Sequence, residues 1–97
     1  MKPVEEIQAI VRQHQSVLQA RYGVLVTGIF GSYVRGEQQQ SSDVDLLVEI
    51  IHPISLLELV GAELYLSEIL GIKVDLVPKR SIREELREVI LSEVVEV

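Results

Sequence analysis

A chain of 97 residues, 47% hydrophobic and 25% charged, has the length and composition of a single folded domain spanning residues 1–97, which excludes a disordered segment. It has no cysteine and no run of 18 apolar residues, which excludes disulfides, thiolate metal sites and a membrane-spanning helix, and we expect a cytoplasmic protein. The net charge of −6 disfavours direct nucleic-acid binding, because an acidic surface repels phosphates.

The N-terminal part of the chain predicts a helix followed by a buried strand. Apolar residues recur at helical spacing across residues 3–22, and Gly23 follows as a plausible stop. Residues 24–30 form a short run rich in β-branched side chains, which is typical of a buried strand. The pair Gly31–Ser32 interrupts that strand.

A short connection and a second strand and helix come next. A short helix or turn is expected over residues 33–37, followed by an exposed polar loop. Residues 43–51 predict a second strand. Ser55 and Glu58 have the spacing of a capping box, so a helix should run from there to about Leu70. Its leucines are spread too widely for a single contact face.

The C-terminal part of the chain predicts a third strand and a last helix. Residues 72–77 form the strand, and Pro78 ends it. Ser81 and Glu84 match a second capping box and would open a helix whose inward residues are Ile82, Leu86, Val89 and Ile90. The apolar tail 92–97 either frays or docks. The order of elements predicts an α/β (α+β) fold, with a small mixed β-sheet packed against helices.

The three aspartates of the chain all lie on predicted strands. Asp43 and Asp45 are two residues apart, so both side chains leave the same face of the strand, roughly 6.5–7 Å apart. Asp75 lies in the third strand between apolar neighbours. If the second and third strands pair, the three carboxylates converge, and two Mg²⁺ ions would relieve their repulsion. Such a metal pair supports in-line nucleotidyl transfer.

A candidate phosphate-binding segment lies between the first two strands. Gly31 lets the backbone approach an anion closely, and the hydroxyl of Ser32 and nearby amides could bind phosphate. Arg35 could reach a phosphate or a carboxylate as a bidentate donor. Each feature has a simpler alternative: a plain turn for the glycine and serine, a solvated strand end for the paired aspartates, and an ion pair with Lys73 for Asp75.

In combination these motifs are more specific than any one of them. Residues 31–48, GSYVRGEQQQSSDVDLLV, resemble the signature of the nucleotidyltransferase superfamily typified by DNA polymerase β. They are most similar to the minimal nucleotidyltransferases, the MNT antitoxins that are paired with HEPN ribonuclease toxins. Asp75, in KVDLV, matches the third carboxylate of that superfamily. The resemblance extends from the first strand through the last helix and implies a polymerase β-like palm fold.

The resemblance also implies a role for each site residue. Gly31 and Ser32 would hold the triphosphate of the incoming nucleotide. Asp43 and Asp45 would bind both Mg²⁺ ions, while Asp75 would bind the catalytic ion and help to activate the attacking hydroxyl. The implied substrate is ATP, and the implied reaction places AMP on a tyrosine of a HEPN toxin, which blocks that toxin.

Two other functions remain open on the sequence alone. The same domain could act as a binding antitoxin that masks its partner with weak or no catalysis, or it could be a structural subunit. The wide apolar helix predicts a stable complex with a partner or with a second copy of the chain.

Four further residues carry alternatives. His14 lies on the apolar stripe of the first helix and is expected to be structural. Tyr33 either packs near the nucleotide or fills a gap behind its loop. Lys79 and Arg80 either attract the triphosphate or offset the acidic surface.

Overall fold

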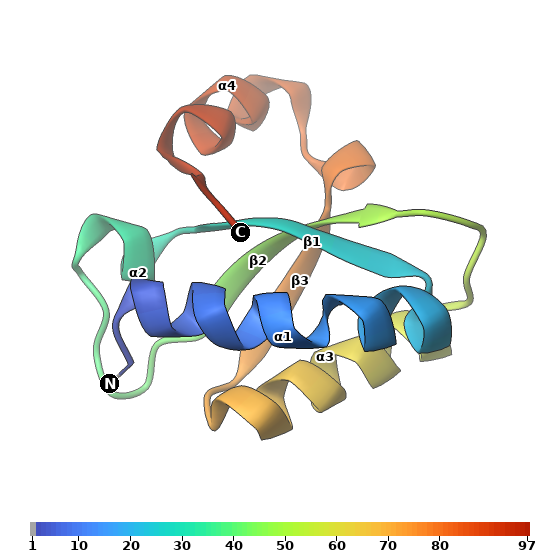
Figure 1. Cartoon of the computed structure of the whole chain (residues 1–97). Helices are drawn as coiled ribbons and strands as arrows, with labels where there is room; N and C mark the ends of the chain where they lie inside the picture. Colours follow the sequence, from blue (N-terminus) through green and yellow to red (C-terminus); the bar gives the residue numbers. More distant parts are fainter. Residues whose placement is uncertain (1) are drawn as a thin grey trace.

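Four strands form one mixed sheet in the order β3-β2-β1-β4 in the computed structural model, which describes residues 2–97 (Figure 1). β1 pairs antiparallel with both β2 and β4, whereas β2 and β3 run parallel. The mixed sheet predicted from the sequence is therefore confirmed. The strands are β1 (Val24–Phe30), β2 (Val44–Ile50), β3 (Val74–Pro78) and β4 (Val95–Glu96).

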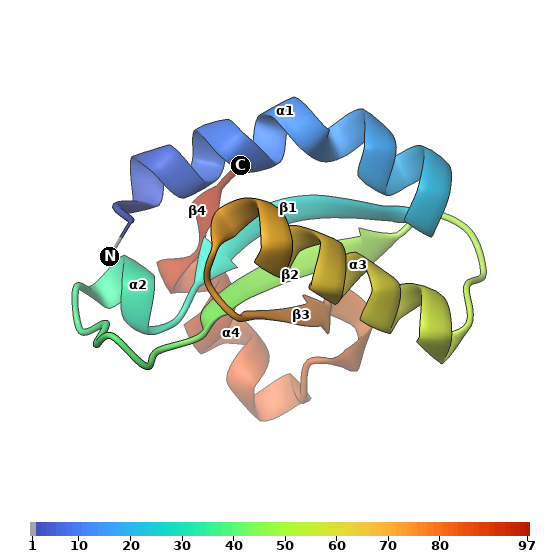
Figure 2. The same ribbon diagram turned by 90° about the horizontal axis from the view of Figure 1, so that it is seen from below.

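The helices cover the two faces of the sheet unequally. α1 and α3 lie side by side on one face, and α4 stands on the opposite side (Figures 1 and 2). The helices are α1 (Val4–Tyr22), α2 (Ser32–Arg35), α3 (Leu56–Leu70) and α4 (Glu84–Glu93). None of the helices formed by residues 2–97 combines the length and the apolar character that crossing a bilayer requires.

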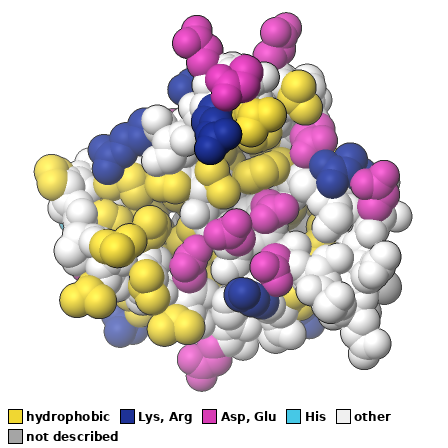
Figure 3. Space-filling view, turned by 180° about the vertical axis from the view of Figure 1, so that it is seen from behind, with side chains coloured by type: hydrophobic (Ala, Val, Ile, Leu, Met, Phe, Trp, Pro, Cys, Tyr) yellow, Lys and Arg dark blue, Asp and Glu magenta, His cyan; other side chains and the backbone are white. Residues whose placement is uncertain are grey.

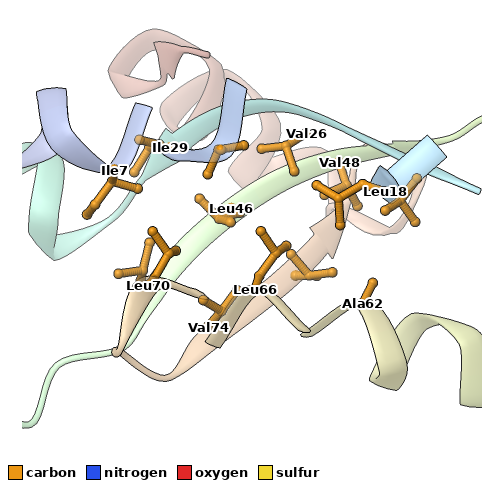
Figure 4. Close-up of a cluster of buried hydrophobic side chains, with 14 of the residues drawn as sticks. Ile7, Leu18, Val26, Ile29, Leu46, Val48, Ala62, Leu66, Leu70 and Val74 are labelled. Carbon is orange, nitrogen blue, oxygen red and sulfur yellow. The ribbon is translucent and has the colours of Figure 1, made fainter. Parts of the chain in front are cut away.

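The hydrophobic core lies between the sheet and the α1–α3 layer (Figure 4). β2 is buried almost continuously, as expected of a central strand covered on both faces. The two helices contribute residues at helical spacing, which places one apolar stripe of each against the sheet. The core side chains include Ile7, Val11 and Leu18 of α1, Leu46 and Val48 of β2, and Ala62, Leu66 and Leu70 of α3.

The ends of the first and third helices follow the sequence prediction. Gly23 ends α1 in the left-handed conformation, with φ at 66°, which a glycine adopts without steric cost. The capping box at the start of α3 is confirmed. The Glu58 amide donates to Ser55 Oγ at 3.1 Å, and the Ser55 amide donates to Glu58 Oε1 at 3.0 Å.

The last helix begins later than the sequence predicted. Ser81 is the final residue of a 3₁₀ turn, Lys79–Ser81, and α4 begins at Glu84 with Arg83 as its N-cap. The second capping box is therefore wrong. A 3₁₀ turn follows Pro78 directly, and it uses the segment that would have formed the first helical turn.

Of the four residues predicted to face inward from the last helix, Leu86 and Val89 are exposed and Ile90 is half-buried. Ile82 is buried, at 8% exposure, but it lies before α4 begins. The physical reason is visible in Figure 1, where α4 stands away from the sheet and returns to it through β4. The apolar tail docks there, because Val95 pairs with Ile29 of β1.

Side chains of the two large helices also bond backbone groups of β3 and β1. On the β3 side, the Val74 amide donates to Ser67 Oγ at 3.0 Å, and the Leu76 amide donates to Glu63 Oε2 at 2.9 Å. On the β1 side, Gln15 bonds both the N–H and the C=O of Val26. These bonds satisfy backbone groups that would otherwise template pairing with another chain.

We expect Ser67→Ala to lower the free energy of unfolding by about 1–3 kcal/mol, because the Val74 amide would lose its acceptor. Chemical denaturation monitored by circular dichroism measures the change. Ser16→Ala is the matched control, since it makes the same replacement at an exposed position within α1. Equal stability of the two variants would contradict the role of Ser67 in holding β3.

Candidate active site

The three aspartates lie at the start of β2 and β3. The parallel register places Asp45 directly opposite Asp75, on strands that are about 4.8 Å apart. Asp43 comes just before β2, two residues from Asp45. Figure 3 shows acidic side chains gathered at the middle of one face of the molecule. The strand pairing on which the sequence prediction depended is therefore present.

The surroundings of the cluster raise the pKa of Asp45. Partial burial raises its pKa from 3.8 to about 6, and the carboxylates of Asp75 and Asp43 add repulsion in the same direction. The Arg35 guanidinium opposes the rise. Asp75 is exposed, whereas Asp43 and Asp45 are half-buried. Asp75 is thus the carboxylate most accessible to an incoming group.

The ion pair proposed for Asp75 from the sequence alone is not the one that forms. Lys73 Nζ lies 3.9 Å from Asp43 Oδ2, and the Lys73 side chain is 80% exposed. An exposed pair at this distance contributes little to stability. The cluster therefore keeps its excess of negative charge.

Gly31 brings backbone against this cluster. A Cβ atom at position 31 would run into the carboxylate of Asp45, and the glycine φ of 85° is one that side chains rarely permit. A glycine is required here on both grounds. The backbone of Gly31 thus lies close to the carboxylate of Asp45, and its approach to a phosphate stays a prediction.

The amide of Gly31 and the guanidinium of Arg35 share one acceptor. Gly31 N donates to Glu93 Oε1 at 2.9 Å, and Arg35 Nη1 lies 3.2 Å and 3.3 Å from the two oxygens of Glu93. Arg35 Nε also donates to Glu37 Oε1 at 2.7 Å. Hydrogen bonds to Glu37 and then to Glu93 raise the pKa of Arg35, so it stays a cation. The segment from Gly31 to Arg35 therefore binds an anionic group.

Glu93 was missed by the sequence analysis. It is one of twelve glutamates and lies in a segment whose apolar neighbours dominate the pattern. Its position depends on where α4 lies relative to the Gly31 turn, which no local spacing in the sequence reveals. The number of glutamates in the chain does not distinguish Glu93 from the others either.

The donor set of the cluster suits a hard divalent cation. Carboxylate oxygens are the ligands that Mg²⁺ prefers. Burial, together with repulsion from Asp75 and Asp43, raises the pKa of Asp45, and a bound cation would relieve that repulsion. Over the part of the chain that the structure describes, no three such side chains converge into a ready-made metal cluster. That is compatible with Mg²⁺, which usually binds one or two carboxylates and takes its other ligands from phosphates and water.

A hollow of about 420 Å³ lies beside Asp43. It is lined by Tyr33, the loop residues 40–42 and Lys73, so it joins the loop before β2 to the segment before β3. Tyr33 is also part of the hydrophobic core. Of the two alternatives for Tyr33, filling the space behind its loop is thus confirmed, and the hollow leaves contact with a nucleotide open.

The remaining candidate residues take part in other contacts. His14 Nδ1 lies 2.6 Å from the hydroxyl of Tyr65, so it links α1 to α3 as a half-buried structural residue. Lys79 Nζ lies 3.3 Å from Glu49 Oε1, near the C-terminal ends of β2 and β3, whereas the aspartates lie at the start of these strands. Neither residue contributes to the acidic cluster.

The comparison with protein families assigns the chain to a family. The model of the nucleotidyltransferase domain matches residues 11–97, which include every residue of the cluster. The chain belongs to this family. The enzyme class predicted from the sequence, a nucleotidyltransferase, is thereby confirmed.

Relatives of this nucleotidyltransferase agree with the assignment. The protein adenylyltransferase MntA of Thermococcus cleftensis is 45% identical over 95 residues, which cover 98% of this chain and 96% of the relative. A protein of Methanocaldococcus jannaschii, named provisionally as a protein adenylyltransferase, is 51% identical over 82 residues, or 84% of each chain.

Solved structures share the fold of this nucleotidyltransferase. One, described provisionally as a minimal nucleotidyltransferase, has a TM-score of 0.80 at 34% identity and covers 99% of this chain and 97% of its own. A toxin–antitoxin complex with AMP-PNP has a TM-score of 0.70 at 23% identity, covering 89% of this chain and 70% of its own. The predicted fold class is therefore confirmed.

The raised pKa of Asp45 predicts how stability depends on pH in the absence of metal. Between pH 4 and pH 6 the folded state binds more protons at Asp45 than the unfolded state does, so stability falls as the pH rises through this range. We expect Asp45→Asn to raise the melting temperature at pH 8 and to change it little at pH 4.

Differential scanning fluorimetry with EDTA at the two pH values tests this expectation. Glu85→Gln is the control, because it removes one acidic charge from an exposed position of α4. An Asp45→Asn variant with the same shift at both pH values would show that Asp45 is not strained by its neighbours.

Proposed function

We propose that the chain is a Mg²⁺-dependent adenylyltransferase that transfers AMP from ATP to a tyrosine of a HEPN toxin and thereby neutralises it. The observation that carries the proposal is the register of β2 and β3, which sets Asp45 opposite Asp75 beside the Gly31 turn. Relatives named as protein adenylyltransferases support the choice of reaction. A fold neighbour described as a tri-AMPylated HEPN toxin in complex with an MNT antitoxin suggests the kind of partner.

The residues of the chain divide the binding of ATP between two regions. The Gly31 amide and Arg35 would hold the phosphates, because both already bind the carboxylate of Glu93, and the Ser32 hydroxyl at the start of α2 would join them. Asp43, Asp45 and Asp75 would hold the Mg²⁺ ions. Bound metal would neutralise the charge that develops on the phosphates during displacement.

The transfer itself exchanges a phosphoanhydride bond of ATP for a phosphodiester bond to the tyrosine, and the tyrosine hydroxyl gives up its proton. The tyrosine oxygen forms a bond to the α-phosphorus of ATP while the bond from that phosphorus to the bridging oxygen breaks, and diphosphate leaves with that oxygen. Asp75 is exposed, so its carboxylate is the one that an acceptor hydroxyl can reach and that can help to activate it.

A second function, masking of the toxin by binding alone, is favoured by one observation. Apolar side chains of α3 remain on the surface, with Leu56 at 75% and Leu57 at 82% exposure. The prediction that this helix exposes apolar positions is confirmed. A surface of this kind is typical of an interface with a partner or with a second copy of the chain.

The two functions differ in whether the aspartates are needed. We expect Asp45→Asn and Asp75→Asn to leave binding to the co-expressed toxin intact and to abolish AMP transfer, because an amide is a poor ligand for a hard cation. Intact mass spectrometry of the toxin after incubation with ATP and Mg²⁺ measures the transfer. The exposed Glu85→Gln variant is the matched control and should transfer AMP as the wild type does.

Protection of cells that express the toxin then separates chemistry from masking. Failure of both aspartate variants to protect, despite normal complex formation, is the result that the enzymatic proposal requires. Protection equal to the wild type would assign neutralisation to binding. Absence of any AMP on the toxin with the wild-type protein would overturn the proposed reaction.

A further inference from the structure

Glu93 occupies the donors that the proposed function assigns to phosphate. Its carboxylate accepts the Gly31 amide at 2.9 Å and lies within 3.3 Å of Arg35 Nη1 through both oxygens. The Glu93 side chain is only 22% exposed, whereas that of Arg35 is 47% exposed. The contact is therefore a well-covered one that holds the C-terminal end of α4 onto the Gly31 turn.

A carboxylate and a phosphate compete for such donors. Both are anions with several acceptor oxygens, and both are bound by backbone amides and by guanidinium groups. One amide hydrogen cannot serve Glu93 and a phosphate oxygen with good geometry at the same time. The negative charge of Glu93 also acts on Asp45, whose pKa it helps to raise. A triphosphate that enters while Glu93 is in place would meet four carboxylates close together.

α4 has no buried side chain to hold it against the rest of the molecule, so Glu93 can move. None of the ten residues of α4, all of which the structure describes, is buried. The helix continues into β4, which pairs with β1 through Gly28↔Glu96 and Ile29↔Val95. A displacement of α4 near Glu93 would therefore expose little additional apolar surface, and burial of apolar surface is the main force that holds a helix in place.

We propose that Glu93 is an internal competitor of the nucleotide, whose carboxylate fills the phosphate-binding donors of Gly31 and Arg35 in the free protein and leaves them when Mg²⁺–ATP binds. The inference rests on the proposed function, because it uses the same phosphate site. It makes the end of α4 a regulatory element: contacts that hold Glu93 in place weaken nucleotide binding, and contacts that draw it away strengthen binding.

Isothermal titration calorimetry with ATP and Mg²⁺ tests the competition. We expect Glu93→Ala to bind at least about tenfold more tightly than the wild type. In this variant the Gly31 amide and Arg35 are free, whereas in the wild type their hydrogen bonds to Glu93 must first break. Glu93→Gln should lie between the two, because the amide oxygen still accepts from Gly31 but no longer pairs with the charge of Arg35. Glu88→Ala, an exposed position of the same helix, controls for the removal of one negative charge.

Hydrogen–deuterium exchange of the wild type gives a second measurement that does not depend on any variant. Binding of AMP-PNP with Mg²⁺ should speed exchange in residues 84–93, because the helix loses the anchor at Glu93. The Gly31 amide should stay protected, because a phosphate oxygen replaces Glu93 as its acceptor. Unchanged exchange in α4 while the nucleotide is bound would overturn the competition.

The outcomes distinguish failure of the inference from failure of the proposed function. Weaker binding by Glu93→Ala would show that Glu93 positions Arg35 for the nucleotide. Equal binding would show that Glu93 is displaced at no cost or not at all. Either result overturns the inference and leaves the proposed function standing. No binding of Mg²⁺–ATP by the wild type or by either Glu93 variant would overturn both.

Discussion

The parallel pairing of β2 with β3 is the constraint on which the site depends, because it alone sets Asp45 beside Asp75. The pairing brings like charges together, and repulsion from Asp75 adds to the effect of burial in raising the pKa of Asp45. The rest of the fold holds the strands in this register. β2 is buried on both faces, and α3 bonds the outer edge of β3 through Ser67 and Glu63 on either side of Asp75.

The site also separates opposite charges over a short distance. The carboxylates lie at the start of β2 and β3, while the Gly31 amide and Arg35 lie on the turn that follows β1. A metal–nucleotide complex carries the complementary arrangement, with cations on one side and phosphate oxygens on the other. Gly31 makes the two regions adjacent, because a side chain at this position would collide with Asp45.

The sequence predicted most of the fold, and it predicted the members of the site better than their contacts. Short apolar runs predicted β1, β2 and β3, whereas β4 lies in the tail for which the sequence leaves fraying or docking open. Ser55 with Glu58 located the start of α3 to the residue. Convergence of the aspartates stayed conditional, because side-chain alternation along one strand does not reveal which strands pair. The resemblance matched Asp75 to the third carboxylate, and the structure shows the pairing itself.

The errors share one physical cause, which is that the position of α4 depends on tertiary contacts. Ser81 and Glu84 satisfy the local rule for a capping box, yet the chain uses Lys79–Ser81 for a 3₁₀ turn and starts α4 at Glu84. Apolar residues of α4 were predicted to face inward, whereas this helix stands away from the sheet. Glu93 could not be distinguished from the other glutamates for the same reason.

Paramagnetic relaxation tests the central claim most directly, because Mn²⁺ replaces Mg²⁺ and broadens nearby amide signals. Trace Mn²⁺ is added with AMP-PNP to ¹⁵N-labelled protein, and broadening is mapped along the chain. The account predicts selective broadening at Val44, Leu46 and Leu76, around the paired aspartates, and its loss in Asp45→Asn. Broadening centred elsewhere, or broadening that survives in Asp45→Asn, would contradict the assignment of the metal–nucleotide site to the β2–β3 pair.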